Sequence, residues 1–330
     1  MIFYDNLEEI VFHRHEMFDV DELVVLSGYV GPKPIEKLQT LPLKTSVIYG
    51  MYGSDGIGQS LHKSLVNLDE TISNTNIFYS ELPVHAKCYI WKKKGKITTA
   101  LVGSANFSIN GLSNPYKEVL AETTIDTFSP LDTYVDRVLA YCKRCNEISL
   151  EDTKANKKSS NKSKNEIEVD GVCRMSLLNR SGEVSEKSGL NWGLARLTGV
   201  HTSQGDAYVA ITIPMIERFP DLFPPKLGKT LKTTEGAKMN RQNDAVEFIW
   251  DDGTTMEGLL EGNQTINGIK YPKQLCSAPV KSILGKYLRS RMGINDLDYQ
   301  ITKADLLNYG RTDISISIQG EGVYELDFSV

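Results

Sequence analysis

The residues best suited to chemistry lie in one stretch of the chain, residues 84–108, which reads VHAKCYIWKKKGKITTALVGSANFS. A single alanine separates His85 from Lys87, and a Gly-Ser-Ala-Asn sequence that contains Ser104 and Asn106 follows. In an extended strand, residues two apart project from the same face and lie about 6.5–7 Å from each other. An imidazole and an ammonium at that spacing could hold one tetrahedral anion between them.

The alternation of residue types around these two side chains predicts a half-buried strand over residues 84–92. His85, Lys87 and Tyr89 would share one face of this strand. The next strand would end in the Gly-Ser-Ala-Asn turn, which can direct a hydroxyl and an amide to the same point. The apolar residues would share the opposite face, which suits burial in a core: Val84, Ala86, Cys88 and Ile90.

A histidine, a lysine, a serine and an asparagine that converge on one point suit phosphoryl transfer without a metal ion. Lys87 and Asn106 would neutralise and hold the non-bridging oxygens, as metals do in other enzymes. His85 could attack phosphorus and form a covalent phosphohistidine. A carboxylate should orient the other ring nitrogen, and Glu118 and Glu122 are the nearest downstream candidates. The alternative is a surface strand that carries His-Ala-Lys by chance.

The elements that must position these residues alternate between strand-like and helix-like patterns. Such alternation predicts a mixed or parallel sheet flanked by helices, that is, an α/β domain. The predicted strands cover residues 22–30, 45–52, 76–79, 84–92 and 97–102, and the predicted helices cover residues 34–41, 57–68 and 132–145.

Two local motifs in this half have ordinary interpretations. The loop GSDGIG at residues 53–58 lacks the Gly-Lys-Ser/Thr ending of a P-loop and the spacing of a dinucleotide fingerprint. It predicts a strand-to-helix turn capped by Ser54 or Asp55. Cys142 and Cys145 form a CxxC without a second ligand pair, so we expect two thiols on a helix and no metal site.

The bulk composition predicts two domains joined by a linker. A chain of 330 residues is too long for most single cores, and its net charge of −5 argues against indiscriminate nucleic-acid binding while leaving room for a local basic groove. Residues 154–164, KANKKSSNKSK, hold lysines without acids or large apolar residues, which predicts a solvated segment. We therefore predict a first domain at residues 1–150, a Lys/Ser/Asn-rich linker at 151–170 and a second domain at 171–330.

The second domain is predicted to be mainly β, as a barrel or half-barrel of short strands. A helix is expected over residues 279–292, with Ser277 as its cap and Gly293 past its end. Another should follow a capping box that starts at Thr302. The predicted strands include residues 207–213, 245–251, 313–318 and 323–328.

Three polar stretches in this domain carry side chains that can read base edges or hold phosphates. Each stretch could also be a solvated loop. The candidate DNA-binding residues are Lys187, Ser188, Asn191, Trp192 and Arg196 in the first stretch, Lys270, Tyr271, Lys273 and Gln274 in the second, and Lys238, Asn240 and Arg241 in the third.

Together, His85-Ala-Lys87 and the Gly-Ser-Ala-Asn turn resemble the signature of the phospholipase D superfamily, although the usual aspartate of that pattern is absent. Nearly the whole chain resembles the NgoFVII and BfiI group of restriction endonucleases. The resemblance implies an N-terminal phospholipase D-like nuclease and dimerisation domain and a C-terminal B3-like pseudobarrel that binds DNA sequence-specifically. The first two polar stretches lie where the two DNA-gripping arms of B3-like domains should be.

The resemblance also implies roles for individual residues. His85 matches the nucleophile, and Lys87 and Asn106 match the phosphate binders. Ser104 matches the supporting hydroxyl, and Glu118 matches the carboxylate expected to hold the histidine. A type II-like endonuclease of this kind would hydrolyse double-stranded DNA at or near a specific sequence without metal or other cofactor.

One histidine motif per chain predicts a homodimer. In-line displacement at phosphorus needs a nucleophile on one side and a general acid on the other, so His85 of two subunits would face each other across one composite site. The resemblance implies a DNA methyltransferase in the same system. Some related systems add a separate helicase-like ATPase subunit, and ATP would be needed only through such a partner.

Two other functions are consistent with parts of the sequence: a phospholipase D-type lipid phosphodiesterase, and a DNA-binding protein with an inactive nuclease fold. The single His-x-Lys motif and the polar second domain count against the lipid enzyme. No apolar run reaches the roughly 18–20 residues that span a bilayer. We therefore expect no membrane partner. Five scattered cysteines do not form a disulfide pattern, which agrees with a reducing compartment, so we expect a cytoplasmic location.

Overall fold

The computed structural model describes residues 1–114, 117–149, 172–226 and 243–330. The chain divides into two compact units, one formed mainly by residues before 168 and one mainly by residues after it. The two units are described separately. The whole predicted linker at 151–170 and the third polar stretch, with Lys238, Asn240 and Arg241, lie outside the described residues.

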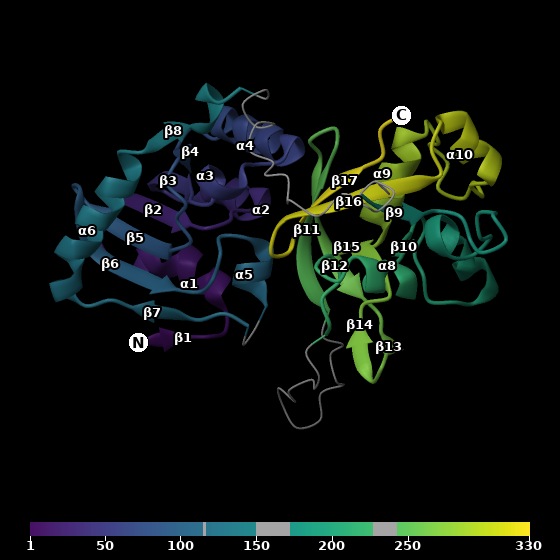
Figure 1. Cartoon of the computed structure of the whole chain (residues 1–330), viewed down its shortest axis with the longest axis horizontal. Helices are drawn as coiled ribbons and strands as arrows, with labels where there is room; N and C mark the ends of the chain where they lie inside the picture. Colours follow the sequence, from purple (N-terminus) through teal and green to yellow (C-terminus); the bar gives the residue numbers. More distant parts are fainter. Residues whose placement is uncertain (115–116, 150–171, 227–242) are drawn as a thin grey trace, which may run out of the picture. The chain divides into compact units, whose positions relative to one another are not determined.

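The first unit is built on a mixed sheet in the order β1-β7-β6-β5-β2-β3-β4-β8 (Figure 1). Strands β2, β3 and β4 are parallel, whereas β5 pairs antiparallel with β2 and with β6. The strands are β1 (Ile2–Phe3), β2 (Glu22–Ser27), β3 (Lys44–Tyr49), β4 (Thr75–Ser80), β5 (Lys87–Lys93), β6 (Lys96–Gly103), β7 (Leu120–Glu122) and β8 (Cys142–Arg144).

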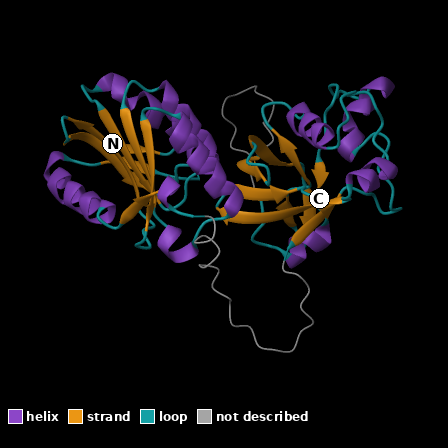
Figure 2. Ribbon diagram, turned by 90° about the horizontal axis from the view of Figure 1, so that it is seen from above, coloured by secondary structure: helices purple, strands orange, loops and turns teal. Residues whose placement is uncertain are grey.

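Helices cover both faces of this sheet (Figure 2), so that the central strands are buried on both sides. Lys87, Tyr89 and Trp91 on one face of β5 are as buried as Cys88 and Ile90 on the other, which corrects the expectation of a half-buried strand. The helices are α1 (Leu7–His13), α2 (Pro32–Lys37), α3 (Tyr52–Asp55), α4 (Gln59–Thr71), α5 (Ile109–Ser113) and α6 (Ile125–Leu139), with short 3-10 turns η1 (Arg14–Met17), η2 (Leu38–Thr40) and η3 (Cys145–Glu147).

The predicted sharing of faces along β5 is confirmed. Val84, Cys88 and Ile90 belong to one apolar cluster, and Ala86 packs against its edge. The same cluster contains Val135 from α6, together with residues of β2 and β3. Burial of this face therefore anchors the segment that carries the candidate catalytic residues.

Three local predictions in this unit were wrong in detail. The predicted helix at 132–145 ends at Leu139, because the chain turns back and adds β8 to the sheet edge, so Cys142 lies in a strand and Cys145 in η3. Helix α4 begins at Gln59, and its N-cap position is Gly58 without a side-chain cap. The structure places Ser54 and Asp55 in the preceding short helix α3 instead.

The second unit is a sheet in the order β10-β15-β12-β11-β17-β16-β9, with a separate hairpin formed by β13 and β14 (Figure 1). The edge strands β9 and β10 approach each other, so the sheet is nearly closed. Its strands are β9 (Cys173–Ser176), β10 (Val209–Ala210), β11 (Asp244–Trp250), β12 (Thr255–Glu261), β13 (Gln264–Ile266), β14 (Ile269–Tyr271), β15 (Gln274–Ser277), β16 (Asp313–Gly320) and β17 (Val323–Asp327).

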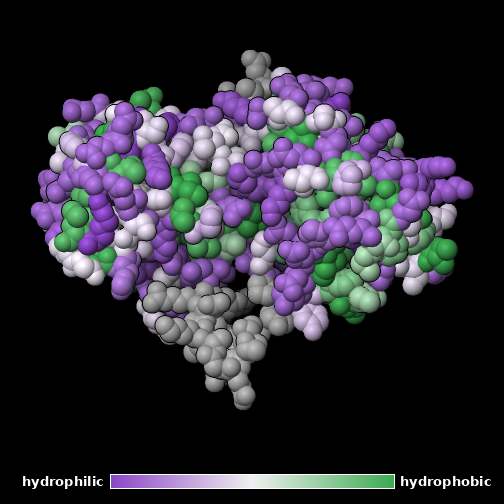
Figure 3. Space-filling model, turned by 180° about the vertical axis from the view of Figure 1, so that it is seen from behind, coloured by the Kyte–Doolittle hydropathy of each residue, from purple (hydrophilic) through white to green (hydrophobic). Residues whose placement is uncertain are grey.

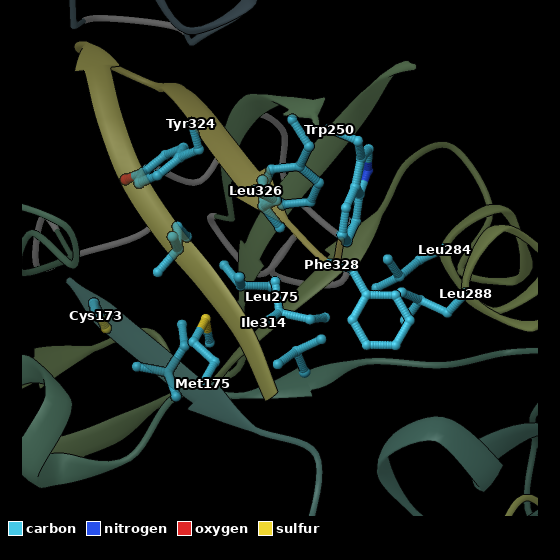
Figure 4. Packing of buried hydrophobic residues seen from close by; sticks show 14 of the residues in the cluster. Cys173, Met175, Trp250, Leu275, Leu284, Leu288, Ile314, Tyr324, Leu326 and Phe328 are labelled. Carbon is cyan, nitrogen blue, oxygen red and sulfur yellow. The ribbon is translucent and has the colours of Figure 1, made fainter. Parts of the chain in front are cut away.

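An apolar core fills this nearly closed sheet, as Figure 4 shows. Trp250 and Tyr324 from the strands and Phe328 directly after β17 are almost fully buried. Leu284 and Leu288 from a helix pack into the same cluster. Burial of side chains of this size supplies most of the driving force for folding of such a domain.

The helices of the second unit agree with part of the sequence prediction. They are η4 (Gly189–Thr198), α8 (Ile213–Arg218), α9 (Ser282–Arg291) and α10 (Lys303–Tyr309). The capping box is confirmed, because the Thr302 hydroxyl accepts from the Asp305 amide while the Asp305 carboxylate accepts from the Thr302 amide. Helix α9 begins three residues later than expected. Ser277 is not its cap residue, although its hydroxyl accepts a hydrogen bond from the Leu284 amide.

None of the helices in the described parts of the chain is long and apolar enough to cross a membrane. The molecular face in Figure 3 is largely hydrophilic, with apolar residues in scattered patches.

Candidate active site and DNA-binding residues

The candidate catalytic residues meet at one end of the central strands β2, β5 and β6 of the first sheet because of the strand order. Strand β2 ends where β5 begins, with Ser27 opposite Lys87 in the antiparallel register. Strand β6 returns beside β5 and ends at Gly103, directly before the Ser-Ala-Asn turn. Strand β5 begins at Lys87, so His85 lies in the segment just before it rather than in the strand.

His85 and Lys87 are in contact, and their exposures are opposite. The Lys87 Nζ lies 3.1 Å from each of the two ring nitrogens of His85 and donates to the His85 carbonyl at 2.7 Å. The imidazole is exposed, whereas the lysine side chain is 5% exposed.

Burial changes the acid–base behaviour of Lys87. Removal of the ammonium from water lowers the pKa of Lys87 below its usual value, and the negative charge of Glu118 partly opposes this shift. The interaction also shows that Glu118 lies within electrostatic range of the site.

The side chain of Asn106 has a fixed orientation. Its Oδ1 accepts a hydrogen bond from the Tyr29 amide at 3.2 Å and lies 3.4 Å from the Ser27 hydroxyl. Because the carbonyl end is held by the Tyr29 amide, the NH₂ of the side chain points elsewhere, and it donates no hydrogen bond among the described residues. Asn106 thus offers two N–H donors from a buried, held side chain.

Ser104 and Glu118 are linked through the backbone. The Ser104 hydroxyl accepts from the Val119 amide at 3.1 Å, and the Ser104 amide donates to the Val119 carbonyl at 2.9 Å. Ser104 therefore fixes the chain directly after Glu118. No hydrogen bond joins Glu118 to His85 in the described parts of the chain, whereas the other candidate, Glu122, is paired with the buried Arg14.

Three consecutive residues at the end of β2 complete the site, and sequence reasoning missed them. The Ser27 hydroxyl donates to the Tyr29 carbonyl at 2.6 Å and accepts from the Phe107 amide at 2.9 Å, which joins the β2 end to the turn after β6. A Cβ on Gly28 would lie 2.9 Å from the His85 ring. The only sequence signal was a Ser-Gly pair directly after the apolar run LVVL.

Tyr29 forms one wall of the site. Its ring meets the His85 ring edge-on, with centroids 5.9 Å apart. Its hydroxyl donates to Asp55 at 2.5 Å, and the Ser54 hydroxyl donates to the same carboxylate. Burial and the hydrogen bond to Asp55 raise the pKa of Tyr29 to about 12, so it remains a neutral phenol near neutral pH.

The other histidines of the first unit have structural surroundings. His62 is buried, with one ring nitrogen 3.0 Å from the Tyr79 hydroxyl and the other 3.1 Å from the Ile148 carbonyl. His13 is exposed and contacts Glu9 and Glu16. Among the described residues, no three His, Cys, Asp or Glu side chains are grouped so as to hold a metal ion.

Two of the predicted DNA-binding residues are engaged in contacts within the domain. Asn191 is fully buried: its amide donates to the carbonyls of Ser185 and Ile301, and its Oδ1 accepts from the Ile301 amide. Arg196 is paired with Asp298 and donates to the Gly193 carbonyl. Side chains committed in this way cannot also bond a base without breaking these contacts.

The remaining described candidates are at least partly accessible. Lys187, Lys270 and Lys273 are exposed, and Ser188, Trp192, Tyr271 and Gln274 are partly so. Lys270 lies in the β13–β14 hairpin, whose two-residue loop is Asn267-Gly268. Both loop residues have positive φ, as a type I′ turn requires.

Comparison with protein families agrees with this architecture. The NgoFVII restriction endonuclease N-terminal PLD domain matches residues 5–152, and the NgoFVII C-terminal B3-like DNA-binding domain matches residues 166–319. The predicted fold classes of both halves are therefore confirmed: a phospholipase D-like nuclease domain joined to a B3-like DNA-binding domain. The chain belongs to the NgoFVII family of restriction endonucleases and is a site-specific DNA nuclease.

Among solved structures, NucT from Helicobacter pylori is similar at 20% sequence identity, over 44% of this chain and 97% of that chain, with a TM-score of 0.33. No curated protein was found to match the chain.

Proposed function

We propose that this nuclease hydrolyses double-stranded DNA at or near a specific sequence through a covalent phosphohistidine, without a metal ion. The observation that carries the proposal is the arrangement where β2 ends and β5 begins. The exposed imidazole of His85 lies beside the buried ammonium of Lys87, and the side-chain amide of Asn106 is held in place. The exposed His85 ring can reach a phosphate, and the buried side chains of Lys87 and Asn106 are fixed in position.

In the first step, an unprotonated nitrogen of His85 attacks phosphorus, a P–N bond forms and the bond to the leaving deoxyribose oxygen breaks. Lys87 and the NH₂ of Asn106 stabilise the charge on the non-bridging oxygens. The leaving oxygen takes a proton from a general acid. In the second step, water attacks the phosphohistidine and the P–N bond breaks, which frees His85.

Glu118 is proposed to orient His85 once DNA is bound. Its charge already acts on Lys87, and the hydrogen bonds between Ser104 and Val119 hold its backbone in place. Glu122 is a poor substitute, because it neutralises the buried Arg14.

The general acid is proposed to be His85 of a second subunit, so that the functional unit is a homodimer with one composite site. His13 and His62 in the same chain are occupied by other contacts. One site would then cut two DNA strands in succession. Dilution should abolish activity as the dimer dissociates, and a monomer with full activity would contradict this part of the proposal.

In the B3-like domain, the two arms are proposed to bind DNA through Lys187 and Trp192 on one side and Lys270, Tyr271 and Lys273 on the other. Double-stranded DNA is the proposed partner, with a methyltransferase protecting host sites. A helicase-like ATPase subunit would be needed only if the isolated protein fails to cut DNA that it binds.

The central test is cleavage of plasmid DNA in EDTA by the wild type and by His85→Ala. We expect discrete fragments with the wild type and none with the variant. Denaturing electrophoresis after rapid acid-free quenching should trap a protein–DNA adduct that is stable to base and labile to acid, as a phosphoramidate is. A requirement for divalent metal, or full activity in His85→Ala, would refute the proposal.

A further inference from the structure

A second polar cluster lies on the outer face of the B3-like sheet, where strands β12 and β15 pair (Figure 1). Residues of β12 alternate between core and surface, with Met256 and Leu260 in the apolar core. Glu261 follows on the outer face, directly opposite Gln274 in the β12–β15 register. Glu261 was not among the residues predicted from sequence, whereas Gln274 was.

The Glu261 carboxylate is held through one of its two oxygens. Its Oε2 accepts from the Gln274 Nε2 at 3.2 Å and from the Cys276 Sγ at 3.0 Å, and it is also paired with the Lys281 Nζ. All three contacts are made to the same oxygen, and none reaches Oε1 in the parts of the chain that the structure describes. Three donors fix the orientation of the carboxylate and leave one oxygen as an acceptor.

The protonation states of this cluster make Glu261 an acceptor under ordinary conditions. Burial alone would raise the pKa of Glu261, but the hydrogen bonds from Lys281 and Cys276 outweigh it and the pKa is lowered. Burial and the adjacent carboxylate raise the pKa of the Cys276 thiol to about 12, so it keeps its proton and remains a donor. Glu261 is thus ionised and held near neutral pH.

The cluster lies between the two proposed arms of this unit. The Lys281 Nζ is 4.9 Å from the ring centroid of Trp192, which belongs to the first arm. The Lys226 amide donates to the Lys270 carbonyl in the second arm, and the charge of the Lys226 side chain interacts with Glu261. Lys281 and Lys226 offset the negative charges of Glu261 and of the neighbouring Asp244, which allows a carboxylate to lie near DNA phosphates.

We propose that Glu261 is a specificity-determining residue that accepts a hydrogen bond from the exocyclic amino group of a base in the major groove. A carboxylate accepts from cytosine N4, the pairing that suits it best, and adenine N6 offers the same chemistry. Lys281, Cys276 and Gln274 are positioning residues that hold the acceptor. The inference rests on the proposed role of the B3-like domain in reading DNA.

The test uses the full chain with His85→Ala, so that DNA is bound without being cut, in EDTA. Duplexes with a randomised central region are selected for binding, and the base preferences of the parent are compared with those after Glu261→Gln. Glu257→Gln is the matched control, because Glu257 lies on the same strand and the same outer face. Affinity for a non-selected duplex is measured in parallel.

We expect Glu261→Gln to weaken selection of a cytosine or an adenine at one position by roughly tenfold, the usual cost of one lost base contact. Affinity for the non-selected duplex should not fall, preferences at other positions should stay the same, and Glu257→Gln should keep the base preferences of the parent. An unchanged preference profile in Glu261→Gln would overturn the inference. If the parent selects no sequence at all, the proposed function of the domain fails instead.

Base analogues keep the inference testable if Glu261→Gln does not fold, as judged by its unfolding transition. Each selected cytosine is replaced in turn by 2-pyrimidinone and each selected adenine by purine, which removes one amino group. Loss of about tenfold in parent affinity at a single position supports the inference and identifies the base. No loss at any cytosine or adenine overturns it.

Discussion

In the nuclease domain, the side chain proposed to attack phosphorus is exposed, and the side chains proposed to hold the phosphate are buried. In the B3-like domain, the lysines proposed to hold phosphates are exposed, and the asparagine proposed to read a base is buried and bonded to backbone. Chemistry on one phosphate needs groups that are fixed in position, whereas steering towards a polyanion needs charges that reach into solvent. Burial of Lys87 therefore serves the proposed chemistry, whereas burial of Asn191 serves the packing of its domain.

The largest expected effect is that of Lys87→Met, which tests whether burial of Lys87 serves catalysis at the expense of stability. Cleavage should fall by about 10²- to 10³-fold, as for loss of one transition-state donor. The free energy of unfolding should rise by about 1 kcal/mol, since a buried ammonium is replaced by an apolar side chain of similar size. Chemical denaturation and single-turnover cleavage measure the two effects, with the exposed Lys63→Met as control.

The same burial predicts a pH dependence. Because the pKa of Lys87 is lowered, the ammonium loses its proton at a lower pH than an ordinary lysine. Activity should therefore fall on the alkaline side of the pH–rate profile, at a pH below the usual lysine range. In the pH interval between the folded and the unfolded pKa, the unfolded chain binds more protons, so stability should rise with pH there. A cleavage rate that stays constant with rising pH would show that the positive charge of Lys87 does not contribute to catalysis.

Asn191→Ala tests whether burial of a polar side chain in the B3-like domain serves stability and not DNA binding. Removal of the side chain leaves the Ile301 amide and two backbone carbonyls without their partner, which should cost about 1–3 kcal/mol of stability. The base preferences of the folded fraction should not change. The exposed Asn263→Ala is the control for stability. A changed preference at normal stability would restore Asn191 as a DNA-reading residue.

Gly28→Ala should lower the rate of cleavage by about tenfold, because the added methyl group displaces the His85 ring. DNA affinity should remain near that of the wild type, since Gly28 belongs to the nuclease domain. Gly28→Ser adds a further atom at the same place and should slow cleavage more. Equal rates for all three proteins would show that the His85 ring moves freely during catalysis.

Lys270→Ala should have the smallest effect. Loss of one phosphate contact weakens binding to all sequences alike and reduces the slope of log affinity against log salt by about 1. Titration of duplexes at several salt concentrations measures the slope, and the exposed Lys286 on α9 provides the matched control. A change confined to one sequence would mean that Lys270 reads a base.

Sequence reasoning identified the part of the site that is encoded locally. Four candidate residues lie within about 20 positions of one another: His85, Lys87, Ser104 and Asn106. The pairing of β5 with β6 brings their two segments together, and burial of the apolar face of the first segment fixes its orientation. The contribution of Ser27, Gly28 and Tyr29 depends on β5 inserting next to β2, which the order of strands along the chain does not reveal.

The same limit explains why the sequence did not reveal the internal contacts of Asn191. An asparagine beside a tryptophan and a lysine has the composition of a DNA-reading loop. Its partner Ile301, however, is 110 positions away in the sequence, and only the packed domain brings the two together. A local pattern can suggest what a polar side chain is able to bond, but tertiary packing decides which partner it meets.

The Asn267-Gly268 turn has a consequence for the speed and strength of DNA binding. A two-residue turn with both residues at positive φ fixes the register of β13 and β14, and the two strands are paired along their length. An arm that is already ordered loses little conformational entropy on binding. If the hairpin is the second arm, as proposed, Lys270 would be in place at the first encounter with DNA, whereas a disordered loop would first have to order.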